Sequence, residues 1–171
     1  MIIHKTHRPI RYQRGAAKVL LVFLAGLILI PLLIIGFYEG RKAYWDAKVR
    51  EMCAIDGGVK IHQTHEVDLR TYQTLINQFG KVDIPRKGDV RSIESALVHT
   101  YEDVYLRRSS PEVRRSRISV IRSSDGSVIA TNTTYSRVGG DLVAFHPSYL
   151  SCPPTPSDFY GSVVLIKGNG K

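Results

Sequence analysis

The chain has 171 residues, which is enough for one small domain and a membrane anchor. Hydrophobic residues make up 43% of it, a composition that excludes an intrinsically disordered chain. The formal net charge of +9 suggests nucleic-acid binding until it is divided along the chain. Residues 1–18 hold five of the 24 Lys and Arg residues and no acidic residue, so more than half of the excess lies there. Because the remainder is only mildly basic, no nucleic-acid partner is expected.

A run of twenty uncharged residues at positions 19–38 predicts a membrane-spanning helix. At about 1.5 Å rise per residue, the run covers roughly the 30 Å hydrocarbon core of a bilayer. Pro31 removes one internal hydrogen bond, which membrane helices tolerate. A cleavable signal peptide is the main alternative, but its apolar region is shorter and ends at small residues. Residues 39–56 are expected to continue as a juxtamembrane helix that the following Gly57 ends.

The orientation of the predicted span follows from the basic residues at its two ends. Five lie before it, and four lie soon after it: Arg41, Lys42, Lys48 and Arg50. Long domains also cross a membrane largely regardless of their charge. We therefore expect a cytoplasmic tail at residues 1–18 and an extracytoplasmic domain at residues 57–171.

Two cysteines bracket the outer part of the chain, Cys53 at its start and Cys152 near its end. Outside the cytoplasm a disulfide between them is favoured. In the chain-entropy model a loop of this size stabilises a domain by up to about 4–5 kcal/mol. The alternative is two unrelated buried thiols, because cysteine is often buried.

The first half of the outer domain is expected to contain a strand, a helix and a second strand. Apolar residues alternate over 59–69, which predicts a half-buried strand. Asp68 is placed to cap a short helix that Gly80 would end. Residues 95–107 are rich in Val, Thr and Tyr and favour a strand, although a helix also fits their pattern.

The second half is expected to form a hairpin, an extended loop and a last strand. The dipeptide Asp125-Gly126 separates two β-rich runs, which predicts a hairpin of residues 114–122 and 127–135. Four prolines predict an extended loop over 145–157, and residues 160–167 predict a final strand. The expected fold class is α+β: one N-terminal transmembrane helix, then a small antiparallel β-sheet with one or two helices.

One loop holds residue types that could form a nucleophilic site. Asp141, His146 and a hydroxyl of Ser148 or Ser151 lie close in sequence, as an acid, a base and a nucleophile. Such residues are frequent in loops, and Asp141 and His146 are equally suited to binding backbone amides there. No catalytic residue is therefore assigned. No cofactor is expected, and no metal, since His62 and His65 would point to opposite faces of a strand.

The densest charge cluster is a set of arginines around the predicted hairpin. One interpretation is that these arginines line an exposed sheet edge and keep it from pairing with another chain. The other is that they contact anionic lipid head groups or an acidic partner. The cluster comprises Arg107, Arg108, Arg114, Arg115, Arg117 and Arg122.

Several short motifs give the chain a resemblance to known proteins. They are the segments Cys53-Ala-Ile-Asp-Gly-Gly-Val-Lys-Ile, Ile121-Arg-Ser-Ser-Asp-Gly, Gly139-Gly-Asp and His146-Pro-Ser-Tyr-Leu-Ser-Cys-Pro. With these motifs the chain resembles a group of small, uncharacterised bacterial single-pass inner-membrane proteins. The resemblance implies a bacterial inner-membrane setting and names no catalytic residue.

Two classes of function fit these observations. The leading hypothesis is a non-enzymatic envelope protein, whose periplasmic domain binds another envelope protein or the lipid bilayer. It predicts an exposed patch and no deep polar cleft. The alternatives are a membrane-tethered periplasmic hydrolase that uses the loop around Asp141, and an immunity or accessory protein.

Overall fold

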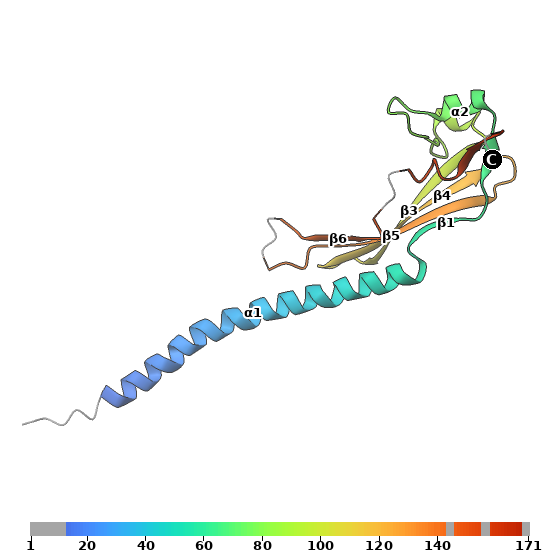
Figure 1. Ribbon diagram of the computed structural model, residues 1–171. Coiled ribbons are helices and arrows are strands. Elements are labelled where there is room, and N and C mark those ends of the chain that lie inside the picture. The colour runs from blue at the N-terminus through green and yellow to red at the C-terminus, as the bar shows by residue number, and fades with distance from the viewer. Residues whose placement is uncertain (1–12, 143–145, 155–157, 169–171) are drawn as a thin grey trace, which may run out of the picture.

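The longest element of the protein is a single helix, α1, which spans Gln13–Asp56 (Figure 1). The computed structural model describes residues 13–142, 146–154 and 158–168, with side chains from residue 18 onward. Helix α1 continues through Pro31, so the predicted span and the predicted juxtamembrane helix form one element. Its part near the N-terminus is long and apolar enough to cross a membrane, and its most apolar segment buries no residue against the domain.

Five strands form the main sheet, which is antiparallel throughout. Strands β3 (Leu97–Arg107), β4 (Glu112–Arg122) and β5 (Val128–Val138) lie side by side. The remaining edge of β5 pairs with β1 (Gly58–Ile61) along one half and with β6 (Tyr149–Cys152) along the other. The α+β fold class and the hairpin are thereby confirmed.

A smaller layer covers one end of this sheet. It contains a parallel pair of short strands, β2 (His65–Val67) and β7 (Val164–Ile166). Helix α2 (Leu69–Leu75) follows β2, and the carboxylate of Asp68 caps it by accepting from the Thr71 amide at 2.7 Å. A 3-10 turn, η1 (Val90–Ser92), precedes β3. Figure 1 places α2 at the end of the domain farthest from the apolar half of α1.

Three predicted elements differ from those observed. The strand predicted over 59–69 is interrupted, because the amides of His62 and Gln63 both donate to the Ile129 carbonyl, at 2.8 and 3.0 Å. The predicted helix stops at Leu75 rather than at Gly80, because the next residue adopts an extended conformation. The loop predicted over 145–157 contains strand β6, whose backbone pairs with an edge of β5.

The two faces of the main sheet bury two separate cores. Along β4, Val113 faces α1, whereas Ile118 and Val120 point to the opposite face because side chains alternate along a strand. On the first face Val49 of α1, 0% exposed, packs against Val113 and Tyr135. On the second face the smaller layer, including Phe159, packs against the end of the sheet where β3 and β5 begin and β4 ends. Helix α1 is therefore part of the folded domain as well as a membrane-type helix.

Candidate functional site

The last turns of α1 are fastened to the sheet by a disulfide. Cys53 of α1 and Cys152 of β6 are bonded, with Cα atoms 6.0 Å apart. Beside it, the Tyr135 hydroxyl donates to the Asp56 carboxylate at 2.6 Å, and Arg117 lies 3.5 Å from the same carboxylate. Burial raises the pKa of Tyr135, and the hydrogen bond to Asp56 raises it further. The free cysteines of the alternative interpretation are not observed.

A buried arginine that sequence reasoning missed forms a second attachment. Arg137 of β5 is 2% exposed, and its guanidinium forms an ion pair with Asp46 of α1. The same guanidinium donates to the Gly139 carbonyl and, at 2.9 Å, to the Ser148 hydroxyl. The charge of Arg137 is therefore neutralised by α1, and its remaining donors hold the loop that begins at Gly139.

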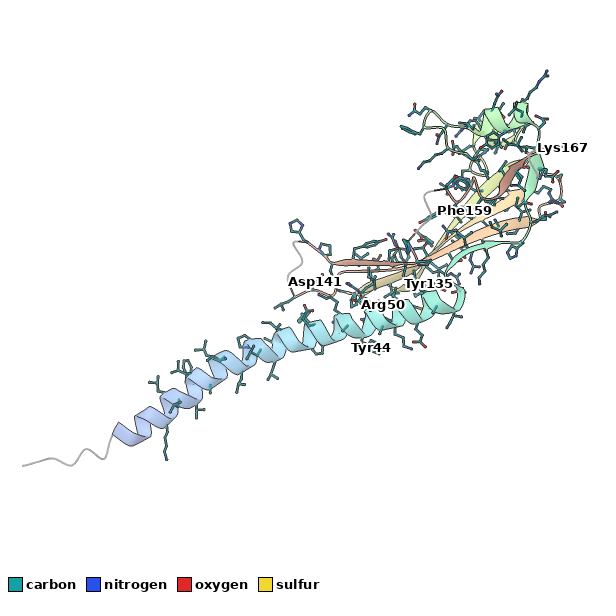
Figure 2. The ribbon with its side chains drawn as sticks, in the orientation of Figure 1. Tyr44, Arg50, Tyr135, Asp141, Phe159 and Lys167 are labelled. Carbon is teal, nitrogen blue, oxygen red and sulfur yellow. A yellow bond between two sulfur atoms is a disulfide. The ribbon has the colours of Figure 1, made fainter. Side chains whose placement is uncertain are left out.

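The loop predicted to hold a nucleophilic site attaches to α1 instead. Asp141 accepts from the Ser148 backbone amide at 2.6 Å and lies 3.4 Å from the ammonium of Lys42 (Figure 2). That amide and Lys42 hold the pKa of Asp141 below its ordinary value. His146 is exposed and forms no hydrogen bond with the residues described, and it lines neither of the two hollows of the domain discussed below. The structure thus brings Asp141 and Ser148 together, but the Ser148 hydroxyl accepts from Arg137, and His146 is not hydrogen-bonded to it among the described residues.

Each of the six arginines of the predicted charge cluster contacts a neighbouring acid or aromatic ring. The four that pair with a carboxylate have their charge balanced locally, whereas the other two lie over aromatic rings. Arg107 lies 4.9 Å from the ring centre of Trp45, and Arg108 lies 5.5 Å from that of Tyr105. The other four form ion pairs: Arg114 with Asp103, Arg115 with Glu102, Arg117 with Asp56 and Arg122 with Asp125.

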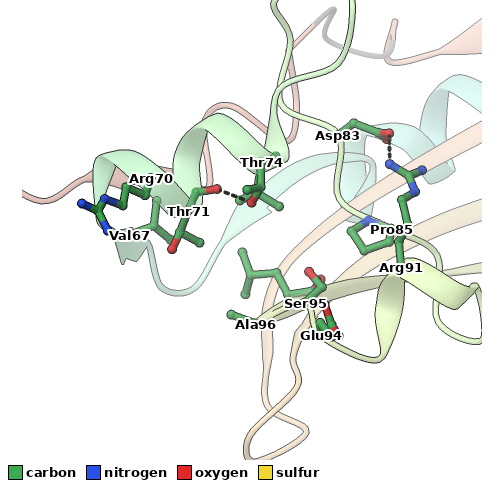
Figure 3. Close-up of a pocket in the computed structure, with 12 residues that line it drawn as sticks. Val67, Arg70, Thr71, Thr74, Asp83, Pro85, Arg91, Glu94, Ser95 and Ala96 are labelled. Atoms are coloured by element: carbon green, nitrogen blue, oxygen red, sulfur yellow. Dashed lines mark hydrogen bonds and ion pairs between the residues drawn. The ribbon is translucent and has the colours of Figure 1, made fainter.

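One hollow of the domain, here called the distal cleft, was not expected from the sequence. It has a volume of about 520 Å³ and lies between α2 and the segment that leads into β3 (Figure 3). Its rim is polar: Arg70 stands on α2, and Arg91 opposite is paired with Asp83 at 3.1 Å. Its floor is apolar and is formed by Val67, Leu75, Pro85 and Leu97. A concave site with an apolar floor and a few polar groups is typical of ligand and peptide binding.

Large apolar side chains stand exposed on the segments that form the distal cleft. Val90 is 86% exposed and Ile93 is 83% exposed; they do not line the cleft but stand beside Arg91 and Glu94, respectively, which do. Leu69 begins α2 and Phe79 lies in the turn after it, and both are also exposed. Exposed apolar side chains therefore stand on both the segment of η1 and the segment of α2.

Neither known proteins nor a metal centre assigns a chemistry to these sites. No protein-family model, no curated protein and no solved structure matches the chain. Within residues 13–142, 146–154 and 158–168, no three His, Cys, Asp or Glu side chains lie close enough together to hold a metal ion. The geometry of the chain itself therefore has to carry any functional conclusion.

Proposed function

We propose that this chain is a non-enzymatic interaction or accessory protein of the bacterial envelope, tethered to the inner membrane by α1. Its tail lies in the cytoplasm, its domain lies in the periplasm, and the distal cleft binds another envelope protein. The observation that carries the proposal is the unbroken helix α1, which the disulfide, Asp46 and Asp56 fasten to the sheet. A domain fixed in this way to its anchor directs the distal cleft away from the bilayer.

The chemistry of the distal cleft indicates the kind of partner. Its apolar floor and the exposed Val90 and Ile93 fit an apolar helix or loop of another protein. Arg70 on its rim forms no ion pair with the residues described, so an acidic side chain of the partner would fit beside it. An immunity protein that acts from the membrane would be one form of the same function.

Two features support the periplasmic placement. The five basic residues of the tail are typical of a cytoplasmic segment next to a span. The disulfide between Cys53 and Cys152 is of the kind that persists in oxidising compartments and is rare in the cytosol.

Site-specific photo-crosslinking in the native host tests the proposal. A photoreactive amino acid replaces Val90 or Ile93, and as a matched control it replaces Lys60, an exposed residue of β1 outside the cleft. We expect both cleft positions to give the same cross-linked envelope protein and Lys60 to give none. The proposal is wrong if neither cleft position cross-links to a protein, or if all three positions give the same products.

A further inference from the structure

The second hollow lies on the sheet face opposite α1 and is lined by hydroxyl side chains. We call it the hydroxyl hollow; its volume is about 220 Å³. The core around Phe159 covers only the other half of this face. Tyr101 at one side of the hollow is 45% exposed, and Tyr149 at the other is 61% exposed. The hydroxyls come from paired positions of neighbouring strands: Ser116 of β4, Thr134 and Ser136 of β5, and Ser151 of β6.

A buried amide in the hydroxyl hollow lacks a partner. Asn132 lies two residues before Thr134 on β5, so its side chain is on the same face. It is 2% exposed, and its Oδ1 accepts no hydrogen bond from the residues described. Buried polar atoms are nearly always paired, so a native exception calls for an explanation, and a bound ligand that donates a hydrogen bond is one.

The charges around the hydroxyl hollow do not favour an anionic ligand. Its one cation, Arg114, donates to Ser136 at 3.2 Å and lies 3.9 Å from Asp103. Tyr101 donates to the Ser116 hydroxyl at 3.3 Å, and Ser116 in turn donates to Asp103. Arg114 is therefore already balanced, and two of the hydroxyl protons are already used. The other hydroxyls of the hollow can donate as well as accept, a mixture that matches a neutral polyhydroxyl ligand, and no unpaired cation is present among the described lining residues to attract an anion.

We propose that the hydroxyl hollow binds one ring of a neutral glycan. A sugar ring carries hydroxyls that donate to Asn132 and the serines, and it has apolar C–H faces that pack on aromatic rings such as Tyr101 and Tyr149. The volume is below the roughly 300–1,000 Å³ of pockets that enclose drug-sized ligands, which suits one ring of a chain that continues outside. This site lies apart from the distal cleft and adds a second binding activity to the proposed protein contact.

Saturation-transfer NMR on the full chain in lipid nanodiscs, without sugar-based detergent, tests this inference. The probes are the neutral tetrasaccharides of N-acetylglucosamine, glucose and mannose, with inositol hexakisphosphate as the anionic probe. Asn132→Leu removes the amide with little change of shape, and Tyr149→Ala removes one ring wall. Tyr44→Ala is the matched control, because Tyr44 is 55% exposed but lies on α1, outside the hollow.

We expect saturation transfer to at least one neutral tetrasaccharide, with unchanged binding in Tyr44→Ala. In Asn132→Leu and Tyr149→Ala the Kd should rise by about tenfold or more, the effect of losing one good contact. Thermal unfolding shows whether Asn132→Leu folds; if it does not, the exposed Tyr149 alone decides the result. The inference is overturned if no neutral tetrasaccharide receives transfer, if the hollow variants bind as the wild type does, or if only inositol hexakisphosphate binds.

Discussion

Replacing Asp46 by Asn removes the charge that neutralises Arg137 while keeping the shape of the side chain. The Arg137 side chain is 3% exposed and that of Asp46 is 22% exposed, so the pair is shielded from water. Breaking a buried pair by removing one partner costs about 3–5 kcal/mol, because the remaining charge stays buried. Because Arg137 keeps its hydrogen bonds to Gly139 and Ser148, the loss of stability in Asp46→Asn should lie near the lower end of this range, at about 3 kcal/mol. For a domain of this size that corresponds to a fall in Tm of roughly 10 °C or more.

The fluorescence of Trp45, the one tryptophan of the chain, reports this attachment directly. Trp45 packs against the core between α1 and the sheet, so urea unfolding of the full chain in micelles exposes it. The matched control is Glu51→Gln, which breaks the exposed pair of Glu51 and Lys48 on the same helix and should change stability by less than about 1 kcal/mol. If Asp46→Asn unfolds at the same urea concentration as Glu51→Gln, the attachment through Arg137 contributes nothing and the reasoning fails.

Three further changes act on the same attachment. Replacing both Cys53 and Cys152 by Ser opens a long loop and should cost about 2–5 kcal/mol in urea unfolding; an unchanged midpoint would contradict the stapling role. Tyr135→Phe deletes the hydrogen bond to Asp56 and should cost about 1.5–3 kcal/mol by the same assay, whereas a loss below about 0.5 kcal/mol would show that the bond is not needed. Asp141 has a pKa below its ordinary value in the folded protein, so its contribution is present above about pH 4 and is lost as the pH falls through the folded pKa. The difference in Tm between wild type and Asp141→Asn should therefore be constant near neutral pH and should disappear in acid. A difference that does not depend on pH would contradict this.

Features that depend on neighbours in sequence were predictable. The apolar run of α1 is long enough to predict, without any tertiary contact, a helix that could cross a membrane. Asp125-Gly126 determines the hairpin locally: the Asp125 carboxylate accepts from the Ser127 amide at 3.0 Å, and Gly126 takes a φ of +73°. The capping of α2 by Asp68 is local in the same way.

Features that depend on distant partners were not predictable from local patterns. Arg137 looks like any strand arginine until Asp46, 91 residues away, is placed against it. A signal was present on α1, where Asp46 and Asp56 share the helix face of Val49 and Cys53 at spacings of three and four residues. Acidic residues on a buried face require basic partners, which the sheet supplies. Strand β6 was missed for the same reason, because it forms only where β5 offers an unpaired edge.

The orientation of the domain is the claim on which the proposed function depends most directly. Single cysteines at Phe79, an exposed residue in the turn after α2, and at Lys18, at the N-terminal end of the apolar run, can be probed with a membrane-impermeant maleimide on intact spheroplasts. The native cysteines are bonded to each other and do not react. We predict labelling of Phe79→Cys and protection of Lys18→Cys until the membrane is permeabilised. Labelling of Lys18→Cys with protection of Phe79→Cys would place the cleft in the cytoplasm and contradict the account.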